Sequence, residues 1–80
     1  MFINKTKDGR NNLCGKQVAA LRAAHKWSQR VLADRLQLVG LDIDKNAVQR
    51  LECGKRFVTD IELEALALVF DVPVQQLLQG

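Results

Sequence analysis

The sequence has few of the residues on which catalysis, metal binding and disulfide cross-linking depend. Its only histidine is His25, and its two cysteines, Cys14 and Cys53, do not form a CxxC pair. One pair of cysteines is too few for a disulfide scaffold, so we expect two free thiols. No serine or cysteine has a spacing that suggests a nucleophile and its base. The sequence therefore predicts no enzyme, no metal site and no cofactor, and no small-molecule ligand is evident.

Features of β-sheet and membrane proteins are scarce as well. The 80 residues include no tyrosine, one proline (Pro73) and five glycines. The many Ala and Leu residues favour helices over strands. No apolar run approaches the ~20 residues that cross a bilayer, and the N-terminal MFINKTKDGRNN lacks the apolar stretch of a signal peptide. We predict one small all-α domain without a membrane segment and expect a cytoplasmic location.

The charged residues are sorted along the chain. The net charge of +3 combines +6 in residues 1–30, +1 in residues 31–56 and −4 in residues 57–80. A chain of this kind can turn a basic face to a polyanion and keep its acidic end away. This sorting is compatible with nucleic-acid binding, and it becomes informative only together with a motif.

Capping residues and apolar spacing predict five helices that follow a basic N-terminal arm. Ser28, Asp44 and Thr59 are suitable N-caps, Glu62 completes a capping box with Thr59, and Gly54 supplies a left-handed stop. The expected helices cover about residues 15–25, 29–38, 45–53, 60–71 and a short last segment that starts at Pro73. The predicted organisation is an arm (1–12), flexible or inserted into a minor groove, and a compact five-helix domain (13–80).

The third expected helix has the side chains of a helix that reads DNA. Its outward residues are Lys45, Asn46, Gln49 and Arg50. Asn and Gln can pair with adenine, and Arg or Lys with guanine, in the major groove. Lys55 and Arg56 follow Gly54, where a phosphate backbone would pass. Alternatively, the four outward residues are only the solvated face of an amphipathic helix, and the two later cations compensate its dipole.

Several motif pieces recur in a fixed order along the chain. They are Arg22 in the first helix, Ser28-Gln29 opening the second, Leu32-Ala33 within it, Val48, Leu51 and Glu52 in the third, and Gly54-Lys55-Arg56 after it. The combination resembles the Cro/phage-repressor (XRE-type) helix-turn-helix family, whose fold is lambda-repressor-like, over about residues 13–78.

This resemblance implies a transcriptional regulator that binds double-stranded DNA at a two-fold operator as a homodimer. It places the third helix in the major groove and Gln29 at a phosphate. It also implies a structural ion pair between Arg22 and Glu52 that holds the third helix to the rest of the domain.

The segment between the second and third helices departs from the family. Residues 38–44, LVGLDID, make a longer turn than is common there, and Asp42 and Asp44 would lie near phosphates. Asp44 is explained as an N-cap, whereas Asp42 is not. The two carboxylates and the acidic last third support an alternative, a protein-interaction module or antitoxin-like partner-binding protein on the same fold.

The fourth expected helix has a second apolar side. Its inward set is Leu63, Leu66, Ala67 and Phe70, which leaves Ile61, Ala65 and Leu68 elsewhere on the helix. Exposed apolar patches commonly mark association surfaces, so we expect these three residues at a homodimer interface. The alternative is that Ile61 and Leu68 lie over the last helix and complete the core.

Overall fold

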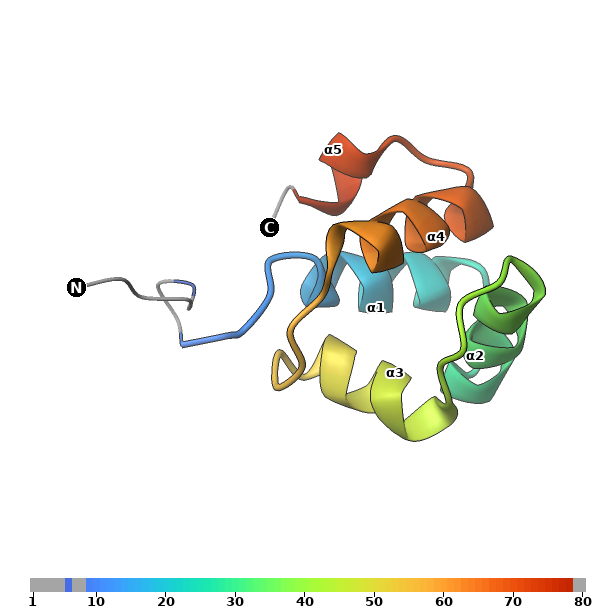
Figure 1. Cartoon of the computed structure of the whole chain (residues 1–80), viewed down its shortest axis with the longest axis horizontal. Coiled ribbons are helices and arrows are strands. Elements are labelled where there is room, and N and C mark those ends of the chain that lie inside the picture. The colour runs from blue at the N-terminus through green and yellow to red at the C-terminus, as the bar shows by residue number, and fades with distance from the viewer. Residues whose placement is uncertain (1–5, 7–8, 79–80) are drawn as a thin grey trace.

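The chain folds into five α-helices and no β-strand within Thr6 and residues 9–78, the residues that the computed structural model describes. The helices are α1 (Gly15–Ala24), α2 (Gln29–Leu38), α3 (Lys45–Glu52), α4 (Asp60–Phe70) and α5 (Val74–Leu77) (Figure 1). This architecture confirms the all-α, five-helix prediction. Pro73 is the N-cap of α5 rather than its first residue. Within the described residues, no helix has the length and apolarity that crossing a membrane requires.

Residues just outside α2, α3 and α4 bind the first backbone N–H groups of these helices, as predicted. Ser28 Oγ accepts a hydrogen bond from the third residue of α2 at 3.1 Å, and Asp44 Oδ1 accepts one from the third residue of α3 at 2.8 Å. Thr59 and Glu62 form the predicted capping box of α4. Since an N-cap contributes about 1 kcal/mol, short local sequences decide where these three helices begin.

Every helix contributes apolar side chains to the core. The fully buried ones are Val18, Leu32, Leu36, Val48, Leu51, Leu66 and Leu77. Burying a side chain of this size contributes about 1.5–3 kcal/mol, so this cluster is the main source of stability. α3 packs against α1 and α2 through its apolar side, and this leaves its other side at the surface.

The long turn between α2 and α3 is held at both ends. Gly40, with a φ of 93°, lets the N–H of Leu41 return to the carbonyl of Leu36 at 3.0 Å. Gln37 Nε2 donates to the carbonyl of Ile43 at 2.9 Å, and Ile43 is 3% exposed. The turn is therefore an ordered connection that fixes where α3 starts.

Residues 10–12 differ from the flexible arm that the sequence predicted. Arg10 Nη2 donates to the carbonyl of Glu52 at 2.6 Å, and the N–H of Asn11 donates to the carbonyl of Gly54 at 2.8 Å. Asn12 is buried. The folded part of the chain therefore begins by Arg10, because these contacts attach the segment to the end of α3. The rest of the predicted arm, residues 1–5 and 7–8, lies outside the described residues.

Candidate nucleic-acid interface

α3 has one buried apolar side and one exposed polar side. Ala47, Val48 and Leu51 are buried, and the exposed residues are Lys45, Asn46, Gln49 and Arg50. Within the part of the chain that the structure describes, none of these four side chains makes a hydrogen bond or an ion pair. Their donors and acceptors are therefore available to a ligand, and they form one row because positions 45, 46, 49 and 50 share a helix face.

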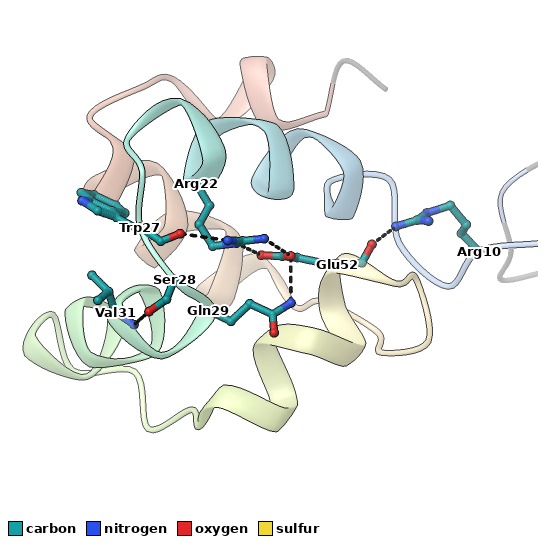
Figure 2. Close-up of polar contacts among 7 residues, drawn as sticks. All are labelled: Arg10, Arg22, Trp27, Ser28, Gln29, Val31 and Glu52. Atoms are coloured by element: carbon teal, nitrogen blue, oxygen red, sulfur yellow. Dashed lines mark hydrogen bonds and ion pairs between the residues drawn. The ribbon is translucent and has the colours of Figure 1, made fainter.

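Glu52, the last residue of α3, is tied to α1 by an ion pair (Figure 2). Its Oε2 accepts a hydrogen bond from Arg22 Nε at 2.7 Å, and its Oε1 accepts one from Arg22 Nη2 at 3.1 Å. Arg22 also donates to the carbonyl of Trp27 at 2.8 Å. The hydrogen bond with Glu52 raises the pKa of Arg22. The pair therefore fastens the C-terminal end of α3 to α1.

Gln29 belongs to the same network instead of standing free for a phosphate. Its Nε2 donates to Glu52 Oε1 at 3.1 Å, and the side chain is half-buried (Figure 2). One N–H of the amide is used in this bond. The second amide N–H and the backbone N–H groups of Gln29 and Arg30, which the Ser28 cap does not use, are the donors that remain for an anion.

The two basic residues after Gly54 have different surroundings. Lys55 is exposed, whereas Arg56, which is half-buried, donates from Nη2 to Oε2 of the buried Glu62 at 2.5 Å in an ion pair. Burial opposes ionisation of Glu62, but hydrogen bonds from Thr59 and Arg56 outweigh it and hold the pKa of Glu62 below its ordinary value. Lys55 is therefore the more accessible cation, and Arg56 joins the loop after α3 to α4.

Both cysteines are free thiols, as predicted. Burial raises the pKa of Cys14 to about 11, so this thiol stays protonated at neutral pH, whereas Cys53 is exposed. Among the described residues, no group of three or more His, Cys, Asp or Glu side chains could hold a metal ion.

Comparison with known proteins gives the family of this chain. A family model described as helix-turn-helix matches residues 18–77. The chain belongs to the helix-turn-helix family. A solved structure, the restriction-modification controller protein C.AhdI from Aeromonas hydrophila, matches with a TM-score of 0.68 and 28% identity, and the match covers 79% of this chain and 84% of that chain. No curated protein matches the sequence significantly.

This helix-turn-helix protein is a DNA-binding transcriptional regulator of the XRE type. The resemblance read from Arg22, Gln29 and the third helix is confirmed at the level of the family. The family found is a regulatory DNA-binding family and not an enzyme family.

Two carboxylates stand at the start of the second helix of the helix-turn-helix. Asp44 Oδ1 accepts the N–H of Ala47 at 2.8 Å, so its charge serves the N-terminus of α3. Asp42 is exposed in the turn. Asp44 is therefore explained as a helix cap, whereas no contact among the described residues explains the Asp42 carboxylate, which would be repelled by a nearby phosphate.

The outer side of α4 exposes two of the three residues expected at a dimer interface. Ile61 is 73% exposed and Leu68 is 64% exposed, so these two side chains do not complete the core. Ala65 differs from the expectation because it is 8% exposed and belongs to the core. It lies in a hollow between α4 and the α2–α3 turn that Val39, Gly40, Leu41 and Glu64 also line.

The contacts of residues 10–12 with the end of α3 were not predicted from the sequence. Asn12 Oδ1 accepts the N–H of Gly15 at 2.8 Å, and its Nδ2 donates to carbonyls beyond α1. An Asn side chain commonly accepts a hydrogen bond from a backbone N–H a few residues further along, so this local signal was available. The contacts with α3 carried no local signal, because they join residues about forty positions apart.

Proposed function

We propose that this regulator is a sequence-specific repressor or controller that acts in the cytoplasm as a homodimer on a two-fold operator. In this proposal α3 lies in the major groove. The observation that carries it is the exposed polar row Lys45, Asn46, Gln49 and Arg50, on a helix whose opposite side is buried in the core.

The chemistry of this row suits base edges. The amides of Asn46 and Gln49 can each donate and accept toward adenine, and Arg50 or Lys45 can donate two hydrogen bonds toward guanine. Asn46 and Arg50 are about one helical turn apart, so both side chains point to the same side of α3. A bidentate contact of this kind contributes about 1–3 kcal/mol of discrimination between bases.

Groups near the C-terminal end of α3 suit phosphates. The N-terminus of α2 offers backbone N–H groups and the second amide N–H of Gln29 beside Glu52, and Lys55 follows the same end of α3. Arg56 has a smaller part in this proposal than the sequence suggested, because its guanidinium is engaged by Glu62.

The apolar outer side of α4 supports the homodimer. Ile61 and Leu68 are exposed at the hollow that Ala65 also lines, and a two-fold contact there would remove these two side chains from water. The acidic residues of the last third, Asp60, Glu62, Glu64 and Asp71, lie on α4 or directly after it, and Figure 1 draws α4 above α3. Such a dimer can present two copies of α3 to major grooves about 34 Å apart while its acidic ends face away from DNA.

The likeness to a restriction-modification controller supports a role of the controller kind. A methyltransferase gene next to the gene for this protein would support the same role, whereas a toxin gene or a divergent phage promoter would favour an antitoxin or a phage repressor.

The test begins with selection of duplexes from a random-sequence library by the wild-type protein. Gel-shift titrations at two salt concentrations then measure affinity for the selected operator and for random DNA. Asn46→Ala and Arg50→Ala should each reduce operator affinity by about 1–3 kcal/mol and leave affinity for random DNA nearly unchanged. The matched control is Gln75→Ala, which removes an exposed amide on α5. This variant should bind like the wild type.

Two outcomes would count against the proposal. If no sequence is enriched and the affinity has no steep salt dependence, the protein acts through protein contacts instead. If the double variant Asn46→Ala/Arg50→Ala keeps the wild-type operator preference, α3 is not the helix that reads the bases.

A further inference from the structure

The end of α3 is completed by a segment from the opposite end of the chain. An α-helix leaves its last four carbonyls without helical partners. Backbone N–H groups of the following turn return to the carbonyls of Gln49, Arg50 and Leu51. The carbonyl of Glu52 accepts a hydrogen bond from Arg10 Nη2 at 2.6 Å, as Figure 2 shows. The positive charge of Arg10 also complements the negative end of the helix dipole.

Asn11 binds the loop that carries the expected phosphate contact. Its backbone N–H donates to the carbonyl of Gly54 at 2.8 Å, and its Nδ2 donates to the carbonyl of Lys55 at 3.0 Å. The backbone from which the Lys55 side chain extends is therefore held by Asn11.

Asn12 joins the start of α1 to the end of α3. Its Oδ1 accepts the N–H of Gly15 at 2.8 Å. Its Nδ2 donates to the carbonyls of Leu51 at 3.0 Å and Arg56 at 2.7 Å. Asn12 is 8% exposed, and an unpaired amide at this depth would be costly, so all three bonds constrain the two segments.

Two glycines leave the space that this segment occupies. A Cβ at Gly15 would lie 2.4 Å from the carbonyl oxygen of Leu51 and 2.5 Å from Arg10 Nη2. A Cβ at Gly54, whose φ is +79°, would lie 2.8 Å from Arg10 Cζ. Residues 10–12, which we name the strap, thus pack against α1 and the loop after α3 at distances that only glycine permits.

We infer that the strap is a positioning element for DNA reading. It fixes the last turn of α3 and the backbone of residues 54–56, and it thereby sets where Arg50 and Lys55 stand relative to DNA. Bidentate contacts to bases tolerate little displacement, so a looser end of α3 weakens operator binding before it unfolds the protein. This inference rests on the proposed function, because it requires that α3 reads the operator.

The test uses the full chain and substitutions at the two more accessible strap residues. Arg10→Met keeps a stem of similar length and removes the donor and the charge, and Arg10→Lys restores both. Asn11→Ala removes the side-chain bond to Lys55 and keeps the backbone bond. Arg35→Met removes an equal charge on α2, at the ring of Trp27 and away from the strap, and is the matched control. Each variant is titrated with the selected operator and with random duplex at a temperature where circular dichroism shows it fully folded.

Arg10→Met and Asn11→Ala should each lower operator affinity about tenfold, which corresponds to ~1.4 kcal/mol, with a much smaller effect on random DNA. Arg10→Lys should regain most of the loss, and Arg35→Met should leave the ratio of operator to random affinity unchanged. Backbone amide NMR shifts of residues 49–56 should move in Arg10→Met and return toward the wild type in Arg10→Lys.

Three results separate the possible failures. Lower thermal stability with wild-type operator affinity would make the strap a stabilising contact only and would overturn the inference. Equal losses on operator and random DNA would make Arg10 a phosphate contact, which also overturns it. A wild-type protein that enriches no operator would instead refute the proposed function on which the inference rests.

Discussion

Replacing Glu52 with Gln should destabilise the protein by about 3 kcal/mol, although the two side chains have the same shape. The Glu52 carboxylate accepts two hydrogen bonds from Arg22 and one from Gln29, and the side chain is 7% exposed. A Gln amide cannot accept all three, and it leaves the charge of Arg22 without a counterion. Breaking a buried pair in this way costs about 3–5 kcal/mol. We expect the lower end because the Arg22 side chain is 22% exposed and water can solvate part of its charge.

Urea and thermal unfolding followed by circular dichroism measure this loss. About 3 kcal/mol corresponds to a melting temperature lower by roughly 12–24 °C in a domain of this size. The double variant Arg22→Met/Glu52→Met is the control. It should lose less stability than Glu52→Gln alone, because it leaves no uncompensated charge in the site.

A loss below about 1 kcal/mol is the value typical of an exposed pair. Such a result would refute the conclusion that Arg22 and Glu52 are buried deeply enough to hold α3. A double variant less stable than Glu52→Gln would likewise show that packing of the stems, and not the charge, dominates this contact.

The remaining predictions concern the loop after α3, the outer side of α4 and the acid range. Lys55→Ala should lower the slope of log K against log salt by about 0.9, the value expected for loss of one phosphate contact. Arg56→Ala should mainly lower the free energy of unfolding, because the guanidinium of Arg56 is bound to Glu62. Equal slope changes in binding titrations of the two variants would contradict this difference. Leu68→Glu should give a folded monomer by light scattering with weaker operator binding, and a variant that stays dimeric or unfolds would remove Leu68 from the interface. The pKa of Glu62 is lower in the folded protein than its ordinary value of 4.5, so its contribution to stability is present above that pH and is lost as the pH falls below it. Glu62→Gln should therefore show a smaller decrease in melting temperature on acidification, and an unchanged acid profile would assign the dependence to other carboxylates.

The limits of the helices were predictable because their determinants are local. Ser28, Asp44 and Thr59 each bind an N–H group three residues further along, so the signal and its target lie within one short segment. Gly54 has the positive φ that was expected after α3. The apolar side of α3 was equally visible, because a helical period alone decides which residues share a face.

The roles of Gln29, Arg56 and Ala65 depended on the tertiary structure. Gln29 and Arg56 are polar residues beside DNA-binding motifs, and free cations or amides at these positions suit phosphates. In the folded chain their side chains bind Glu52 and Glu62, and the fold buries Ala65. A single sequence shows which residue types are present but not which charges become neighbours once the helices pack.

The amino-acid sequence by itself determined the helix-turn-helix, its caps and the polar row on α3, because each of these depends on residues within a few positions of one another. Only the tertiary structure decided that Arg10, Asn11 and Asn12 hold the end of α3. These contacts span about forty residues, from Arg10 to Glu52 and from Asn12 to Arg56. They exist because the packing of α1 against α3 brings the two segments together, and no local periodicity or capping preference encodes that proximity.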